Sequence, residues 1–409
     1  PIRMHGTNMG SDALFPPKEE AEKIAEFLAA LGINTVRIHA VDRNAEFLPP
    51  SAPRSTTINP DNLDRLEYLI AQLKKRGIYL TTDLFACRQF RPGDNVEHLR
   101  NYKGMEERVA VQFNDDAFES WKEFCRNWLL HRNPYTGMTL AEDPALIFVN
   151  LSNEDTIGNE WNHSPGSPTQ RFLADKYAAY CRKNPGVNPE PILGNSDFQK
   201  FIYEQTRKRS LEMMEFLRNE LKTKFHITSA NNGGNLASTW LRDTYDLVDE
   251  HTYQDHPMFP VVPWNYPMQL GQGSVINGHA WVPLLAMKSR IFGKPFVITE
   301  VDFCYPNMYR NEEGALLGAY GAFQNIDGFF YFSFGGSLCR VMNEQKRICV
   351  FESCYDPVKQ QSYRLSAAYF LRGDVKPAQQ KVSYTIPRNL FRKGQDFSFP
   401  KLNTTGLIN

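Results

Sequence analysis

The chain has 409 residues, which is enough for one large domain or for two domains of ordinary size. Lys and Arg together number 46, and so do Asp and Glu, so no strong net charge is available to attract nucleic acid or an anionic membrane surface. The sequence has no run of about eighteen apolar residues, so it predicts no membrane-spanning helix. We therefore expect an uncharged partner, and neither nucleic acid nor a membrane.

Seven cysteines are spread along the chain without a Cys-x-x-Cys pair or a cluster of Cys and His. A structural zinc site normally needs such a cluster, so the sequence predicts no metal and no other cofactor. Cys349 and Cys354 are close enough in sequence for a local disulfide, and two buried free thiols are the alternative.

Short apolar runs alternate with segments of helical period almost from end to end, which is typical of βα units on a parallel sheet. Strands are expected at residues 2–6, 33–39, 78–83, 145–151, 227–231, 247–253, 295–300 and 328–334. Helices are expected at residues 19–31, 63–76, 118–130, 169–181, 204–222 and 362–371. Eight strands in series predict an α/β fold of the (β/α)8 barrel type.

Three segments interrupt this alternation, and we expect two of them to be long loops inserted between a strand and its helix. Residues 155–200 are rich in Asn, Pro, Gly and Ser, and residues 254–282 combine several prolines with aromatic side chains. Long connections of this kind are usually functional. The third segment is a polar tail, so we expect residues 1–372 to form the barrel and residues 373–409 an extension that packs on it or leads to a further module.

The chain begins with Pro1 and not with Met, and residues 2–6 already have the character of a strand. This start is consistent with removal of a leader, so we expect a secreted or periplasmic protein. The tail leaves room for an accessory domain or for a contact within a homo-oligomer.

Two glutamates stand at the carboxyl ends of apolar strands. Glu154 follows the run 148–151, and Glu300 ends the run 296–299. A carboxylate is costly to place at the mouth of a buried strand, and in a barrel all such strand ends meet at one mouth. Cleavage of a glycosidic bond needs two carboxyl groups, one to donate a proton and one to attack the anomeric carbon or to activate water. The pattern therefore predicts that Glu154 and Glu300 act together.

Further polar side chains occupy the ends of the expected strands: Arg37, His39, Asn153, His251 and Tyr253. An Arg beside the attacking carboxylate would keep it ionised, a Tyr would orient it, and apolar surroundings would raise the pKa of the proton donor. Each residue also has a structural interpretation, as an ion pair or as a satisfied polar group of the core.

His39 shares a strand face with Arg37, and Asp83 ends the third expected strand, so either could contact sugar hydroxyls. His39 and Asp83 together with His251 also allow another hypothesis, a metal-dependent barrel hydrolase. No His-x-His pair follows the first strand, which disfavours that hypothesis.

At these residues the chain resembles the clan A glycoside hydrolases, the retaining (β/α)8 enzymes that include family five cellulases and mannanases and family forty-two β-galactosidases. The resemblance covers residues 2–372, and its motifs follow in barrel order: Val36-Arg37-Ile38, Asn153-Glu154, His251-Thr252-Tyr253 and Ile298-Thr299-Glu300. It implies that Glu154 is the acid/base and Glu300 the nucleophile. It also implies that Asn153 binds the sugar 2-hydroxyl, that Arg37 and Tyr253 hold Glu300, and that His251 lines the cleavage subsite.

The chain departs from this family pattern in two places. Many clan members carry a Trp on strand eight, whereas the residues available here are Phe330, Phe332 and Phe334. We expect sugar-stacking platforms at Phe332 and among the tryptophans, in particular Trp281 and Trp264, with Trp240 as a further candidate. The His usual between strands three and four has only two loose candidates, His98 and His131.

The sequence thus predicts a retaining β-glycoside hydrolase that cleaves a neutral β-linked oligo- or polysaccharide, with β-glucan or β-mannan favoured. The alternative from another class is a catalytically silent barrel that binds glycans. Replacing Glu300 by Gln distinguishes these hypotheses, because it abolishes activity in the first and changes nothing measurable in the second.

Overall fold

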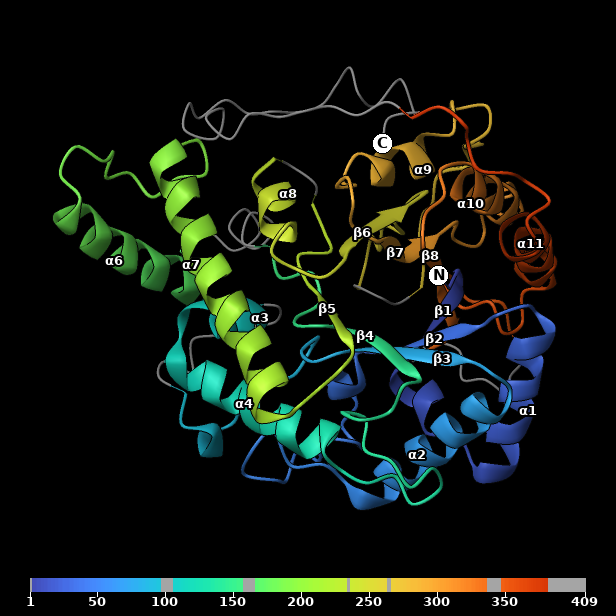
Figure 1. The fold of residues 1–409 in the computed structure, drawn as a ribbon, viewed down its shortest axis with the longest axis horizontal. Helices are drawn as coiled ribbons and strands as arrows, with labels where there is room; N and C mark the ends of the chain where they lie inside the picture. Colours follow the sequence, from blue (N-terminus) through green and yellow to red (C-terminus); the bar gives the residue numbers. More distant parts are fainter. Residues whose placement is uncertain are drawn as a thin grey trace.

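The computed structural model describes residues 2–96, 106–156, 166–233, 236–262, 266–336 and 347–381. Eight parallel strands form one sheet in the order β5-β4-β3-β2-β1-β8-β7-β6, and helices surround them (Figure 1). The strands are β1 (Met4–Gly10), β2 (Thr35–His39), β3 (Tyr79–Asp83), β4 (Leu146–Asn150), β5 (His226–Thr228), β6 (Val248–Tyr253), β7 (Phe296–Asp302) and β8 (Gly328–Gly335). This architecture confirms the predicted (β/α)8 barrel.

The helices follow the strands along the chain. They are α1 (Lys18–Ala30), α2 (Pro60–Lys75), α3 (Glu106–Phe113), α4 (Asp115–Leu129), α6 (Pro168–Lys183), α7 (Ser196–Glu215), α8 (Leu236–Arg242), α9 (Trp281–Met287), α10 (Glu312–Phe323) and α11 (Pro357–Ala367). Short 3-10 turns cover Ser11–Leu14, Val41–Arg43 and Pro92–Asp94, and single π turns extend two helices at Phe216–Glu220 and Ala368–Arg372.

Helix termini follow local capping chemistry. At α2, the side chain of Asn59 accepts a hydrogen bond from the backbone N–H of Asp61, and Pro60 occupies the first helical position. Gly77, just beyond the other end, has a φ of +73°, which a glycine adopts without strain. Such caps also explain why two helices begin earlier than their apolar periodicity predicts, since Asn195 caps α7 and Asp356 caps α11.

The barrel closes between its shortest strand and its neighbour. β5 and β6 do not form a regular ladder, but the N–H of Asp246 donates to the carbonyl of Ile227 at 3.0 Å. The hydroxyl of Thr228 donates to the carbonyl of Leu247 at 3.1 Å. These bonds satisfy backbone groups at the seam and close the barrel. Because the eight strands are parallel, their carboxyl ends all face one mouth.

The interior of the barrel opposite the mouth is filled by side chains from five strands or strand entries: Met4, Phe148, Leu247, Val297 and Phe330. Gly6 of β1 leaves room for this cluster, because a Cβ atom there would lie 2.3 Å from the ring of Phe330. A larger core lies between the strands and the helices. The polar mouth therefore rests on a packed apolar floor.

A buried ion pair fixes the strand that carries Glu300 to the outer helical layer. Lys359 of α11 donates to Asp302 of β7 and, at 3.1 Å, to the carbonyl of Phe351. Both charged side chains are fully buried. Burial raises the pKa of Asp302, and the neighbouring Lys359 only partly offsets this effect.

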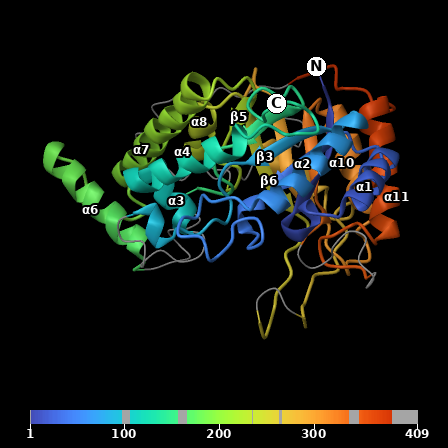
Figure 2. The same cartoon turned by 90° about the horizontal axis from the view of Figure 1, so that it is seen from below.

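Two parts of the chain project from the barrel. The segment after β6 extends away from the body of the molecule, and its Met258 and Gln269 form an isolated antiparallel bridge (Figure 2). α6 stands apart from the strands, beyond α7 (Figures 1 and 2). Both belong to the segments expected as long insertions.

Within the described ranges, no helix is long and apolar enough to span a bilayer.

No disulfide links the cysteines in the described part of the chain, and Cys349 and Cys354 are both buried. The local disulfide considered for this pair is therefore absent, and the alternative of two buried thiols holds. Residues 382–409 lie outside the described residues, so the division between barrel and tail stays a prediction.

Candidate active site

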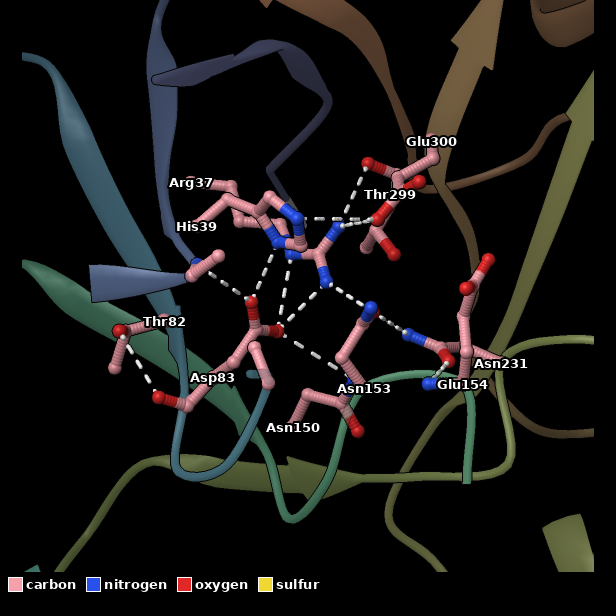
Figure 3. Close-up of polar contacts among 12 residues, drawn as sticks. Arg37, His39, Thr82, Asp83, Asn150, Asn153, Glu154, Asn231, Thr299 and Glu300 are labelled. Atoms are coloured by element: carbon pink, nitrogen blue, oxygen red, sulfur yellow. Dashed lines mark hydrogen bonds and ion pairs between the residues drawn. The ribbon is translucent and has the colours of Figure 1, made fainter. Parts of the chain in front are cut away.

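The mouth of the barrel brings together polar side chains from strands that are far apart in sequence. Arg37 of β2 lies at the centre, between Glu300 of β7 on one side and Asp83 of β3 and Asn153 on the other (Figure 3). Its Nη1 donates to Oε1 of Glu300 at 2.7 Å, and its Nη2 donates at 2.7 Å to both Oδ1 of Asp83 and Oδ1 of Asn153. A planar guanidinium is suited to such multiple contacts, so Arg37 fixes the relative positions of three strand ends.

Arg37 is almost fully buried, and together with His39 it controls the charge of Asp83. Burial alone would raise the pKa of Asp83, but the charges of Arg37 and His39 and their hydrogen bonds outweigh it and hold the pKa well below its usual range. Asn8 of β1 completes the support, since its Oδ1 accepts from Arg37 at 3.2 Å and its Nδ2 donates to the carbonyl of Thr299 at 2.9 Å.

Both carboxylate oxygens of Glu300 accept hydrogen bonds. Oε1 accepts from Arg37, and Oε2 accepts from the hydroxyl of Tyr253 at 2.5 Å. The side chain is only 5% exposed. The contacts implied for Arg37 and Tyr253 by the family resemblance are thus present, and they hold this carboxylate in one orientation.

Glu154 lies just past the end of β4 and is more open to the mouth, with 27% of its side chain exposed. Its φ is +50°, a left-handed conformation that is unfavourable for a residue other than Gly. The backbone N–H of Glu154 donates to Oδ1 of Asn231 at 2.8 Å, which holds this conformation. Arg108 of α3 donates to the carbonyl of Asn153 and lies 3.8 Å from Oε2 of Glu154.

His251 of β6 lies between the two glutamates. Its Nδ1 is 3.0 Å from Oε1 of Glu154 and 3.5 Å from Oε2 of Glu300. Burial disfavours the charged imidazolium, but the charge of Glu300 and the hydrogen bond and charge of Glu154 outweigh it and raise the pKa of His251.

The protonation of Glu154 differs from the expectation that apolar surroundings raise the pKa of the proton donor. Burial does act in that direction, but the hydrogen bond and charge of His251, with the charges of Arg108 and His39, are stronger. They lower the pKa of Glu154, so the expectation is wrong for the ligand-free site. The surroundings of this carboxyl are cationic, which its place after an apolar strand did not reveal.

The two carboxyl groups are close enough to act on one bond. One oxygen of Glu154, one oxygen of Glu300 and one nitrogen of His251 all lie within 4.8 Å of one another. Three such donors could surround a metal ion, but Arg37 and Tyr253 already occupy both oxygens of Glu300, and the guanidinium would repel a cation there. The trio is also not the one proposed for a metal-dependent hydrolase, because it contains neither His39 nor Asp83.

His39 is fixed by Asp83, whose Oδ2 is 2.7 Å from its Nδ1. Its Nε2 points toward the mouth and lies 3.9 Å from Oε1 of Glu300. The ring of Phe332 packs edge-on against His39, at 5.5 Å between centroids, and against Tyr253, at 6.0 Å. His39 and Phe332 therefore line the same side of the mouth as Glu300. Both oxygens of Asp83, by contrast, are hydrogen-bonded within the protein, to Arg37 and His39.

The aromatic candidates on the loops are not joined to this constellation. Trp281 begins α9 with 38% of its surface exposed, and within the described residues no hydrogen bond or ring contact links it to either glutamate. Trp264 and His98 lie outside the described residues. His131 pairs with Glu67 at 2.6 Å in the outer helical layer, so it does not supply the His of the family pattern. The predicted role of Trp281 in substrate binding stays a prediction.

Three residues of the site were not found from the sequence: Arg108, Asn231 and Asp249. Asn231 follows β5, which has three residues and a weak apolar signal. Asp249 lies on β6 two residues before His251, and both Asp249 and Thr299 are buried. The carboxylate of Asp249 accepts hydrogen bonds from the hydroxyl and from the backbone N–H of Thr299. An Asp within an apolar strand was the available signal for Asp249, and nothing in the sequence placed Arg108 beside Glu154.

Comparison with solved structures agrees with this architecture. An endo-1,4-β-mannanase from Rhizomucor miehei superposes with a TM-score of 0.56 at 15% identity, over 90% of this chain and 95% of that one. A hyperthermostable endo-1,4-β-D-mannanase from Thermotoga petrophila gives 0.53 at 15% identity, over 90% and 100%. A family five, subfamily 18 protein from Streptomyces cattleya, in complex with GlcNAc, gives 0.53 at 14% identity, over 93% and 83%.

No family sequence model matches the chain, and no curated protein matches it in sequence. The identities to the solved structures are low, so the comparison concerns the fold. The chain therefore shares the (β/α)8 barrel fold of these solved structures.

Proposed function

We propose that this protein is a retaining β-glycoside hydrolase, with Glu300 as the nucleophile and Glu154 as the acid/base. The observation that carries the proposal is the closeness of the two carboxyl groups, whose nearest oxygens lie within 4.8 Å of each other. Retaining enzymes place these groups about 5 to 5.5 Å apart, whereas inverting enzymes need about 6.5 to 9.5 Å to fit a water molecule.

The two glutamates differ in the way that the two roles require. Glu300 is buried and held by Arg37 and Tyr253, which suits a group that attacks along one direction. Glu154 is more exposed, which suits a group that exchanges protons with the leaving group and with water.

The reaction then follows double displacement. Glu300 attacks the anomeric carbon while Glu154 donates a proton to the departing oxygen, which leaves a covalent glycosyl ester on Glu300. Glu154, now a carboxylate, removes a proton from water, and the water releases the sugar with net retention. Asn153 lies beside Arg37 at the mouth, and in this proposal it binds the sugar 2-hydroxyl.

We further propose a neutral β-linked glycan as substrate, with β-mannan and β-glucan favoured. The balanced charge of the chain favours a neutral polymer, and two of the structurally similar proteins are mannanases. The aromatic ring of Phe332 offers an apolar surface beside His39 and Tyr253, which suits the face of a sugar ring.

The test is sugar release from a panel of β-glucans, β-mannans, β-galactans and xylans by the wild type, by Glu300→Gln and by the surface control Glu19→Gln. We expect activity in the wild type and the control and none in Glu300→Gln. The anomer formed first, followed by NMR, should be β. Initial formation of the α-anomer would refute the retaining mechanism. A folded wild type inactive on every polymer would favour the silent glycan-binding barrel.

A further inference from the structure

The two ring nitrogens of His251 have different partners. Nδ1 faces Glu154 at 3.0 Å, and Nε2 lies 3.0 Å from Oγ1 of Thr299. Which nitrogen carries hydrogen follows from what each partner can donate or accept.

The hydroxyl of Thr299 has a single hydrogen, and the geometry directs it to Asp249. Oγ1 of Thr299 donates to Oδ2 of Asp249 at 2.6 Å, while the backbone N–H of Thr299 donates to Oδ1 at 3.0 Å. Nδ2 of Asn231 donates to the same carboxylate at 3.3 Å. Three donors converge on Asp249, so it acts as an acceptor, and the oxygen of Thr299 is left to accept from His251. Nε2 of His251 therefore carries a hydrogen.

The hydrogen on Nε2 determines what happens at Nδ1. If His251 is neutral, Nδ1 is a bare acceptor and the hydrogen of its 3.0 Å bond must belong to the carboxyl of Glu154. If His251 is charged, Nδ1 carries the hydrogen and Glu154 is a carboxylate. Either way, one proton occupies the bond between His251 and Glu154.

The surrounding charges decide between these two forms. Glu300 lies 3.5 Å from Nδ1 and favours the imidazolium, while Arg108 at 3.8 Å and His39 favour the carboxylate form of Glu154. Within the part of the chain that the structure describes, the hydrogen-bond partners of His251 are Glu154, Thr299 and the carboxylate of Glu250 on its backbone N–H, and none of them is a cation. The proton therefore resides on His251 while the site is empty.

We propose that Asp249, Thr299 and His251 form a proton-holding chain for Glu154, in which Nδ1 of His251 stores the catalytic proton until a glycan is cleaved. The inference rests on the proposed function, since it specifies the source of the proton in that reaction. Asp249 and Thr299 are positioning residues, because they act only by fixing the hydrogen on Nε2.

The transfer balances with the attack by Glu300. When Glu300 forms its ester, it loses the negative charge that favours the imidazolium. The Nδ1–H bond of His251 breaks, the proton passes to Oε1 of Glu154, and Glu154 delivers it to the departing oxygen as the glycosidic C–O bond breaks. His251 is then neutral and Glu154 is a carboxylate. In the second step, water gives a proton to Glu154, Glu300 regains its charge, and the proton returns to His251.

Thr299→Val tests the chain, with Thr299→Ser as the matched control that keeps the hydroxyl. Two substrates of the same sugar are compared: the natural oligosaccharide, whose departing alcohol needs a proton, and a dinitrophenyl glycoside, whose departing phenol does not. General acid catalysis contributes about 100- to 10,000-fold, so partial loss should lower kcat/KM of Thr299→Val on the oligosaccharide by about 10- to 100-fold. The dinitrophenyl glycoside should be cleaved within about 3-fold of the wild-type rate, and Thr299→Ser should resemble the wild type on both substrates.

Equal losses of Thr299→Val on both substrates would overturn the proposal, because they would indicate displacement of Glu300. Unchanged kinetics on both would overturn it as well. The substrate comparison separates the proton chain from a general structural role of Thr299.

Nitrogen NMR of histidine-labelled wild type gives a readout that needs no activity, with the His251 signals identified by their absence in His251→Gln. We expect both nitrogens of His251 to be protonated in the resting protein, and Nε2 to remain protonated when Nδ1 loses its proton at higher pH. Loss of the proton from Nε2 would overturn the proposal. If the wild type cleaves no glycan, the proposed function fails, and the NMR result still decides where the proton lies.

Discussion

Replacing Arg37 by Met should destabilise the fold through the charges that it leaves behind. Arg37 is buried and pairs at 2.7 Å with both Asp83 and Glu300, whose side chains are 1% and 5% exposed. Removing one partner of a buried ion pair typically costs about 3 to 5 kcal/mol, since the remaining charge stays desolvated. Two carboxylates lose their guanidinium partner here, so we expect a loss at the upper end of that range.

Two control variants separate this effect from the loss of any positive charge. Arg372→Met removes a cation that pairs with Asp374 at the surface, where the Arg side chain is 72% exposed. Exposed pairs contribute little to stability because water screens them, so this variant should unfold almost as the wild type does. Arg37→Lys should be intermediate, because an ammonium group cannot reach all three of the oxygens that Arg37 contacts at 2.7 Å.

The loss in Arg37→Met should depend on pH with a definite sign. Arg37 holds the pKa of Asp83 well below its unfolded value of about 4. The stability that Arg37 contributes is therefore fully present above about pH 4, and it is lost as the pH falls from there toward the lowered pKa. The difference between wild type and Arg37→Met, measured by urea unfolding, should therefore shrink from pH 7 toward about pH 3. A difference below about 1 kcal/mol at pH 7, or one independent of pH, would refute the reasoning.

Two further outcomes follow from other contacts of Glu300 and its strand. Tyr253→Phe removes the hydroxyl that donates to Glu300 at 2.5 Å and keeps the ring contacts with Phe332 and Phe351. A hydrogen bond to a charged group is worth about 1.5 to 3 kcal/mol, so kcat/KM should fall by about 10- to 100-fold, and an unchanged value would contradict the assigned role. Lys359→Met should cost about 3 to 5 kcal/mol in urea unfolding by leaving Asp302 buried and unpaired, and Asp302→Asn in the same chain should recover part of the loss. Burial raises the pKa of Asp302 to about 7 even beside Lys359, and removing Lys359 should raise this pKa further, so the deficit of Lys359→Met should grow as the pH rises above about 7. A double variant no more stable than the single one would contradict this account.

The sequence by itself determined the barrel and singled out the two glutamates that meet at its mouth, Glu154 and Glu300. Strand and helix periods repeat often enough to specify eight βα units, and a carboxylate after a buried strand is rare enough to stand out. Element boundaries were less certain. α7 begins at Ser196 and not at residue 204, because the cap on Asn195 extends the helix beyond its apolar periodicity.

Only the tertiary structure decided how the site residues divide their contacts. Asp83 was a candidate for sugar binding, yet Arg37 and His39 occupy its oxygens. His251 was assigned to the cleavage subsite, and its two-sided position between Glu154 and Thr299 depends on how β4, β6 and β7 meet at the mouth.

The protonation of Glu154 shows why the sequence could not predict the pKa values of the site. An apolar strand before a carboxyl predicts a raised pKa, but Arg108 and His251 come from a helix and a strand distant in sequence and reverse the direction. Electrostatic energy depends on the distance between charges, and only the folded chain sets that distance. Hydrophobic pattern is local and legible in sequence, whereas the placement of charges at a site is a property of the closed barrel.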